Sequence, residues 1–210
     1  SGRFEVHLSE PDASPLSLQG PKAPEVMSKI SGDWVKNLKF FHFKEYKIQN
    51  IPVIIARSGW SGEAGYEIYL RDEKKGNELW KIIMSAGKDF NIMPAAPSQI
   101  SRIECGMLSY GSDMTLDNNP YELNMKKFVN LDKKSSFLSR ESLNKINTNG
   151  SSKELVGIEI ISEPFENFVA DHLPIYFNSN VVGKITSSVF SPRLKKNIGL
   201  AIINKRKDLI

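Results

Sequence analysis

The sequence has a single cysteine, Cys105, so the chain cannot form an internal disulfide bond. Proteins with so little cysteine are typical of reducing compartments, and we therefore predict a cytoplasmic location. Long apolar stretches are also missing, because no run reaches the roughly 18 residues that a membrane-spanning helix needs. The N-terminus has no apolar segment of the kind found in secretory signals. We therefore expect no membrane partner.

Residues with the spacing of a metal site or a nucleophilic triad are absent too. His7, His42 and His172 lie far apart on different predicted elements, so the sequence predicts no metal site. Cys105 has no histidine near it in sequence, which favours a packed cysteine over a nucleophile. The residues alone therefore name no catalytic group.

The sequence also lacks a strong charge imbalance, since its formal net charge is +4 and its pI is about 9.0. A solvated, lysine-rich surface is the simplest interpretation, and we do not expect nucleic acid as a partner. One basic cluster supports the opposite interpretation. Its members are Arg193, Lys195, Lys196, Lys205, Arg206 and Lys207.

Hydrophobic patterning up to residue 148 predicts a mixture of strands and helices. Strands are expected at residues 15–20, 47–58 and 65–70, the second of them including a hairpin. The unbroken apolar run at 51–55 indicates a strand that is covered on both faces. Helices are expected at residues 24–30, 74–87, 94–111 and 137–145.

The pattern changes after the segment NTNGSSK, residues 147–153, which is polar and rich in turn-forming residues. Beyond it, short strands separated by turns follow one another without helical periodicity. These strands are ELVGIEII, PIYF, VVGKITSSVF and NIGLAII. We therefore predict an α+β domain at residues 1–148 and a small β-barrel or sandwich at residues 152–210.

The stretch ARSGWSGEAGYEIYL, residues 56–70, places Glu63 in a glycine-bordered loop between two predicted strands. A carboxylate only accepts hydrogen bonds, and it matches two parallel N–H donors, such as an arginine or the aminopyrimidine edge of a pterin or guanine. The glycines would let the backbone approach a flat ligand, and Trp60 offers an apolar face. Two interpretations stay open: Glu63 binds a ligand, or it is a hairpin residue in solvent or paired with Arg57.

Seven stretches together resemble the aminomethyltransferases, the family of the T-protein of the glycine cleavage system. RSGWSGEAGYEI resembles the family's R-T-G-Y-T-G-E-x-G-x-E-I, and SRIECGMLSYGSDM resembles its R-L-E-A-G-x-x-x-Y-G-x-D/E. The other five are SLQGPKA, NPYE, SFLSRESL, ELVGIEI and VGKITSSVFSPRLKKNIGLAII. The seven stretches follow the family's order and cover nearly the whole chain.

This resemblance implies the T-protein fold, in which a ferredoxin-like α+β part is followed by a small C-terminal β-barrel around a folate channel. It implies tetrahydrofolate as the acceptor of a one-carbon unit from a small amine or sulfonium acid. The family's N-terminal part, which holds its catalytic aspartate, has no counterpart in this sequence, and we expect the last strands of the barrel to be missing too. The resemblance therefore implies a truncated member with an unknown catalytic residue, which could form oligomers through its truncated surfaces.

Residue by residue, the resemblance implies a cofactor-binding set of Glu63, Trp60, Arg102, Tyr110 and Arg193. Glu63 corresponds to the glutamate that binds the pterin's aminopyrimidine edge in relatives, and Trp60 stands where they have tyrosine. Arg102 would meet folate or the substrate's carboxylate, although helical spacing alone favours a structural ion pair for it. Tyr110 would line the channel or pack in the core, and Arg193 would meet the glutamate tail of folate. We expect Glu104, Gly106 and Asp113 to be structural.

Several departures distinguish the sequence from the glycine cleavage T-protein itself. PSQ at 97–99 replaces A-R-D, TSS at 186–188 replaces T-S-G, and residues 123–134 lack the family's glycine-containing continuation. LSYGSDMTLDNNPYE is closer to the dimethylsulfoniopropionate demethylase and dimethylglycine-type branches, so we favour a demethylase-like methyltransferase. The alternatives are the T-protein proper, and a non-catalytic folate-binding or tRNA-modification accessory protein.

Overall fold

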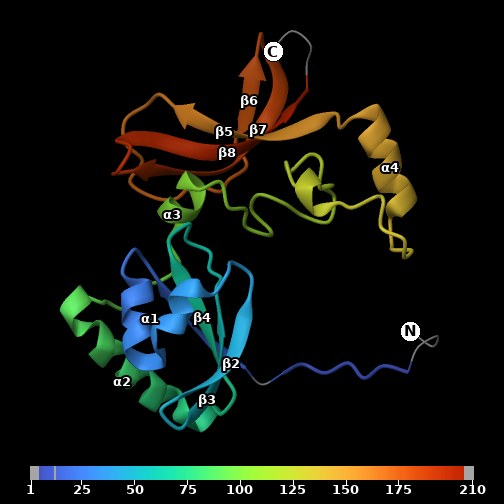
Figure 1. The fold of residues 1–210 in the computed structure, drawn as a ribbon. Coiled ribbons are helices and arrows are strands. Elements are labelled where there is room, and N and C mark those ends of the chain that lie inside the picture. Colours follow the sequence, from blue (N-terminus) through green and yellow to red (C-terminus); the bar gives the residue numbers. More distant parts are fainter. Residues whose placement is uncertain (1–4, 12, 206–210) are drawn as a thin grey trace. The chain divides into compact units, whose positions relative to one another are not determined.

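A computed structural model describes residues 5–11 and 13–205 of the chain. The chain divides into two compact units between Pro97 and Ser98, and each unit contains a four-stranded antiparallel sheet (Figure 1). Helices accompany both sheets, which confirms the α+β class predicted from the sequence.

The sheet of the first unit has the strand order β1-β4-β3-β2. Its strands are β1 (Ser14–Gln19), β2 (Phe43–Ile48), β3 (Ile51–Ala56) and β4 (Gly65–Leu70). Its α-helices are α1 (Ala23–Ser31) and α2 (Gly76–Gly87), with short 3-10 turns at η1 (Asp33–Asn37), η2 (Glu73–Lys75) and η3 (Lys88–Phe90). Both α-helices pack on one face of the sheet, as Figure 1 shows.

Alternation along the strands decides which side chains this face buries. On β4, Tyr66, Ile68 and Leu70 are buried, as their spacing predicts. The run at 51–55 is not covered on both faces, because Pro52 is exposed and Ile54 is only partly buried. The prediction that this strand is covered on both faces is therefore wrong. β3 buries its odd-numbered residues under the helices, and the other face of the sheet stays partly open.

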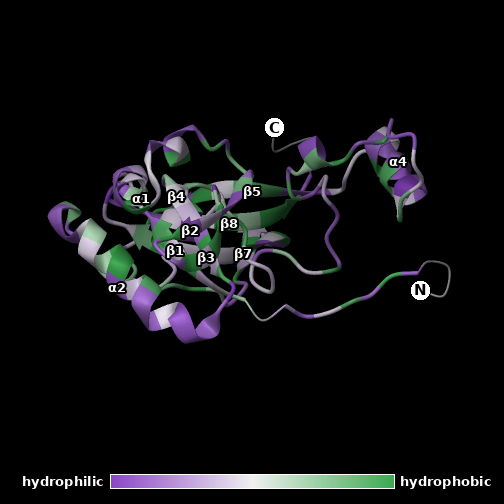
Figure 2. Cartoon of the chain, turned by 60° about the horizontal axis from the view of Figure 1, so that its bottom comes forward, coloured by the Kyte–Doolittle hydropathy of each residue, from purple (hydrophilic) through white to green (hydrophobic). Residues whose placement is uncertain are grey.

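The second unit contains the strands predicted near the C-terminus, in the order β5-β8-β7-β6. They are β5 (Lys153–Ile160), β6 (Pro174–Phe177), β7 (Asn180–Ser191) and β8 (Lys196–Asn204). The unit also contains α3 (Gln99–Glu104), η4 (Lys126–Phe128) and α4 (Arg140–Asn149). Figure 2 shows α4 as mostly hydrophilic, and none of its residues is buried.

Helix α3 is much shorter than the predicted helix at 94–111, so that prediction is wrong in its extent. Ser98 caps its start, and Gly106, at φ +68°, ends it. The Gly106 N–H donates to Ile103 O at 3.0 Å and the Met107 N–H donates to Arg102 O at 2.8 Å, which is the Schellman pattern of a helix end. Cys105 lies at this end and is exposed, so the expectation of a packed cysteine is also wrong.

The predicted linker at 147–153 lies inside the second unit, where it includes the end of α4, the turn after it and the first residue of β5. Two hydrogen bonds connect the chain before this linker with β5. Leu155 N donates to Glu122 O at 2.7 Å, and Asn124 Nδ2 donates to Leu155 O at 2.7 Å. The boundary between the two compact units therefore lies earlier in the chain than the boundary that the composition indicates. The domain limits at residues 148 and 152 stay a prediction.

Candidate functional site

The candidate binding loop, residues 57–64, connects β3 to β4 in the first unit. Gly62, at φ +73°, makes the turn that places Glu63 on the surface. The backbone N–H of Glu63 donates to Ser61 Oγ at 3.2 Å. Among the described residues, no donor contacts the Glu63 carboxylate, so both of its oxygens are available to accept hydrogen bonds.

Arg57 does not neutralise Glu63, so this alternative is wrong. Its Nη1 donates to Gly65 O at 2.6 Å, and its guanidinium carbon lies 4.9 Å from the centre of the Tyr66 ring. The arginine therefore closes the base of the loop, where the two strands meet. Of the two interpretations in which Glu63 binds no ligand, only the solvent-exposed side chain agrees with the structure.

The glycines on either side of the loop have a different role from the predicted one. A Cβ atom added at Gly59 or Gly65 would overlap the side-chain amide of Gln19, far inside the 3.0 Å that Cβ atoms keep from other atoms. Gly59 and Gly65 therefore make room for a side chain of the protein itself. The expectation that they admit a flat ligand stays a prediction, and Gln19 is a residue of this loop's surroundings that the sequence pattern did not indicate.

A second polar cluster lies near the base of the loop, on the face of the sheet that the helices leave open. Ser58 Oγ donates to Glu67 Oε2 at 2.5 Å, and the Tyr69 hydroxyl donates to the same oxygen at 3.2 Å. Burial and the neighbouring Glu67 carboxylate raise the pKa of Tyr69. Glu67 therefore has donors within the protein, unlike Glu63.

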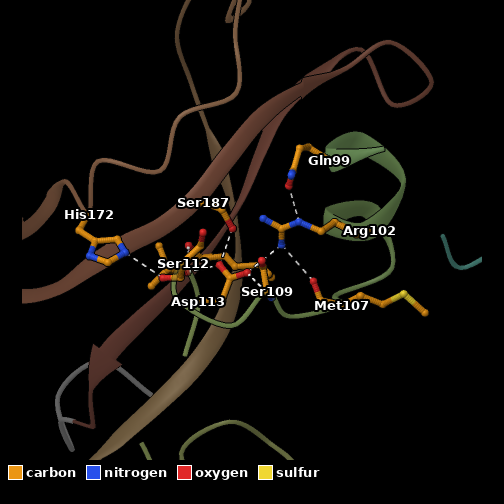
Figure 3. A network of polar contacts seen from close by, with 10 residues as sticks. Gln99, Arg102, Met107, Ser109, Ser112, Asp113, His172 and Ser187 are labelled. Atoms are coloured by element: carbon orange, nitrogen blue, oxygen red, sulfur yellow. Dashed lines mark hydrogen bonds and ion pairs between the residues drawn. The ribbon is translucent and has the colours of Figure 1, made fainter. Parts of the chain in front are cut away.

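In the second unit, Arg102 is completely buried and lies in the polar network of Figure 3. Its Nη1 lies 2.7 Å from Asp113 Oδ2 and donates to Met107 O at 3.1 Å, and its Nε donates to Gln99 Oε1 at 2.5 Å. Two nitrogens of the guanidinium, Nη1 and Nε, therefore donate to three acceptors of the protein, which is typical of a structural arginine.

Asp113 completes this network from the middle of the second unit. Its Oδ2 accepts from Arg102 and from Ser109 N at 2.9 Å, and its Oδ1 accepts from Thr186 Oγ1 at 2.7 Å and from the Ser187 hydroxyl. Each carboxylate oxygen thus has two donors, and the buried charge is fully compensated. Thr186 and Ser187 belong to β7, so the network joins the chain after α3 to the sheet.

Two stretches of the sequence match family descriptions. Residues 3–133 match the GCVT N-terminal domain, and residues 153–209 match the glycine cleavage T-protein C-terminal barrel domain. The chain belongs to the glycine cleavage T-protein family. The resemblance inferred from the seven stretches is thereby confirmed.

Relatives in the T-protein family include proteins with two different names. Dimethylsulfoniopropionate demethylase DmdA of Ruegeria pomeroyi is 34% identical over 204 residues, covering 96% of this chain and 54% of that protein. An aminomethyltransferase of Caldanaerobacter subterraneus is 34% identical over 208 residues, covering 97% of this chain and 54% of that protein. The chain therefore spans about half the length of the curated relatives it matches.

A solved structure shows the T-protein fold directly. Aminomethyltransferase T of the glycine cleavage system from Bartonella henselae superposes with a TM-score of 0.74 at 22% identity. The match covers 92% of this chain and 52% of that chain. At this identity the likeness shows the fold, and it confirms the T-protein-like architecture predicted from the sequence.

The other residues implied by the T-protein resemblance differ in their accessibility. Trp60 is 37% exposed and Tyr110 is 66% exposed, so Tyr110 is not a core residue. Arg193 Nη2 lies 2.6 Å from Glu104 Oε2, with 65% of the arginine side chain exposed. Glu104 also accepts from the Ser191 hydroxyl, which agrees with the structural role expected for it. The cofactor-binding roles of Trp60, Tyr110 and Arg193 stay predictions.

The basic cluster near the C-terminus is largely neutralised where the structure describes it. Besides Arg193, Lys196 pairs with Glu159 at 2.7 Å and Lys205 lies 3.7 Å from Glu154. Arg206 and Lys207 lie outside the described residues. Within residues 5–11 and 13–205, we find neither a group of metal-binding side chains nor a helix long and apolar enough to cross a membrane.

Proposed function

We propose that the protein binds tetrahydrofolate through Glu63 and transfers a one-carbon unit to it from a small amine or sulfonium acid. The observation that carries this proposal is the Glu63 carboxylate, which is exposed at the tip of a hydrogen-bonded loop and accepts no hydrogen bond from the described residues. Such a carboxylate matches the two parallel N–H donors of a pterin's aminopyrimidine edge. Trp60, two residues from the turn at Gly62, would cover the ring.

Bound tetrahydrofolate would supply the nucleophilic nitrogen that accepts the carbon. The residues of this chain contribute binding and orientation, because a pterin held at two points by Glu63 keeps its acceptor nitrogen in one direction. Tyr110 and Arg193 are exposed on the second unit, and a role for them in folate binding stays a prediction. Arg102 would first have to leave its buried network, so we give it a supporting role in the fold of the second unit.

The donor distinguishes two forms of this proposal. The demethylase and the aminomethyltransferase are equally similar to the chain, at 34% identity each. LSYGSDMTLDNNPYE favours the demethylase-like form, and PSQ in place of A-R-D at 97–99 argues against the T-protein proper. We therefore propose a methylated sulfonium acid as the donor. The single cysteine supports a cytoplasmic location for the reaction.

Product analysis tests the proposal. The protein is incubated with tetrahydrofolate and dimethylsulfoniopropionate, and folates are separated by liquid chromatography with mass detection. We expect 5-methyltetrahydrofolate together with the thioether that remains when the sulfonium loses its methyl group, the proton of the accepting nitrogen being released. A parallel incubation with an aminomethyl donor would give 5,10-methylenetetrahydrofolate if the chain had the aminomethyltransferase activity. Absence of any folate product, together with no tetrahydrofolate binding in calorimetry, would overturn the proposal.

A further inference from the structure

Gln19 lies where the first strand of the sheet meets the candidate binding loop. It is the last residue of β1 and stands opposite Gly65 in the antiparallel register with β4. The next residue, Gly20, donates its N–H to Ala64 O at 2.8 Å. Gln19 is therefore distant from the loop in sequence but adjacent to both of its ends in space.

The carboxamide of Gln19 connects two points of the loop. Its Nε2 donates to Ser58 O at 3.2 Å and to Ser17 Oγ at 3.1 Å, and its Oε1 accepts from Ser61 Oγ at 2.8 Å. A backbone carbonyl only accepts, so the bond to Ser58 fixes which end of the amide carries the nitrogen. Both the nitrogen and the oxygen of the amide therefore form hydrogen bonds.

The Ser61 hydroxyl extends this connection to Glu63. It donates its proton to Gln19 Oε1 and accepts from the backbone N–H of Glu63 at 3.2 Å. A continuous series of hydrogen bonds therefore leads from the regular strand β1 to the residue that presents the carboxylate.

Packing selects the same arrangement. Gly59 and Gly65 have no left-handed backbone, but a Cβ atom at either position would overlap the far end of the Gln19 side chain, so a larger residue there would displace the carboxamide from its present place. Gly62, in contrast, is required by its φ of +73°. The loop is therefore built around the Gln19 side chain.

We propose that Gln19 is a positioning residue for the pterin site: its carboxamide holds loop 57–64 in the conformation that presents Glu63. This inference rests on the proposed function, because it assigns to Gln19 an effect on folate binding that passes through Glu63. A loop held in one conformation before binding loses less freedom when the ligand arrives, which strengthens binding.

The test combines a ligand-free measurement with a binding measurement. Gln19→Met keeps most of the side-chain volume and removes the hydrogen bonds, and Ser61→Ala removes only the connection to Glu63. Lys47→Met, at an exposed strand position of the same unit, is the control. In ¹⁵N relaxation, we expect both loop variants to lower the order parameter of the Glu63 amide from about 0.85 toward about 0.6, and the control to leave it unchanged.

Tetrahydrofolate affinity is then measured by calorimetry in the same variants. We expect Gln19→Met and Ser61→Ala to weaken binding about tenfold, and Gln19→Met to change it less than about twofold when Glu63→Gln is already present. An unchanged order parameter in Gln19→Met, or an equal loss of affinity in the Glu63→Gln background, overturns the role of Gln19. An unchanged affinity in Glu63→Gln alone instead overturns the proposed function, so the two failures are distinguishable.

Discussion

Arg102 and Asp113 form an ion pair of 2.7 Å in which neither side chain is accessible to solvent. The pair connects helix α3 to the loop before the sheet of the second unit, and the hydroxyls of Thr186 and Ser187 extend it into β7. Burying two charges is costly, but removing one partner costs more because the other charge is then left uncompensated.

Replacing Asp113 by asparagine should therefore destabilise the protein strongly. We expect Asp113→Asn to lower the free energy of unfolding by about 3–5 kcal/mol, measured by urea denaturation. The matched control is Asp89→Asn, whose partner Lys29 lies 2.8 Å away in an exposed pair, and we expect it to leave the free energy of unfolding almost unchanged because solvent screens the pair. Equal costs for the two substitutions would show that the buried network is not structural.

Two strand glycines of the second unit should respond differently to alanine. A Cβ atom at Gly183 would lie 2.5 Å from the backbone oxygen of Ile202, whereas at Gly157 it would meet nothing within 4 Å. Backbone cannot move aside easily, so we expect Gly183→Ala to cost about 1–3 kcal/mol. Gly157→Ala should be neutral or slightly stabilising, by roughly 0.5 kcal/mol. Thermal unfolding of both variants checks this, and a reversed order would contradict the packing of β7 on β8.

Tyr66 should make the protein sensitive to alkali. Its hydroxyl donates to Val35 O at 3.0 Å, and burial raises the pKa of the phenol, with Arg57 partly opposing this effect. Because the folded pKa lies above the ordinary value of about 10, the unfolded chain loses its proton first as the pH rises. The contribution of Tyr66 to stability is thus complete below about pH 10 and is lost as the pH passes through the raised folded pKa.

Urea unfolding between about pH 8 and pH 11 measures this effect. Tyr66→Phe should lose about 1 kcal/mol at neutral pH, because one hydrogen bond is gone, and its stability should then fall less steeply in alkali than that of the original protein. Identical slopes for the two proteins would show that the phenol does not have the raised pKa.

Periodicity predicted β4 well because its residues alternate against a single packed face. Tyr66, Ile68 and Leu70 were assigned correctly on this basis, and the strands near the C-terminus lie close to where their sequences place them. The long helix at 94–111 was wrong because the pattern of apolar residues continues past Gly106, while the backbone turns there at φ +68°. A local pattern does not register such a turn when apolar residues occur on both sides of it.

The site was only partly predictable, since its decisive contacts join residues far apart in the chain. Glu63 was predicted as a site residue from its own loop and from the family resemblance. Gln19 was not, because its contact with the glycines is visible only once β1 pairs with β4. Likewise, helical spacing could not show that Arg102 is buried, because its partner Asp113 is held by hydroxyls more than 70 residues further on.

The central claim is that the Glu63 carboxylate binds the pterin edge of tetrahydrofolate. The most direct measurement compares calorimetric affinities for tetrahydrofolate in the original protein, in Glu63→Gln, and in the control Glu73→Gln, which changes an exposed glutamate of the same unit. Each charge-assisted hydrogen bond is worth about 1.5–3 kcal/mol, so we expect Glu63→Gln to weaken binding by about tenfold to a hundredfold and Glu73→Gln to leave it unchanged. An affinity of Glu63→Gln within about twofold of the original would contradict the account.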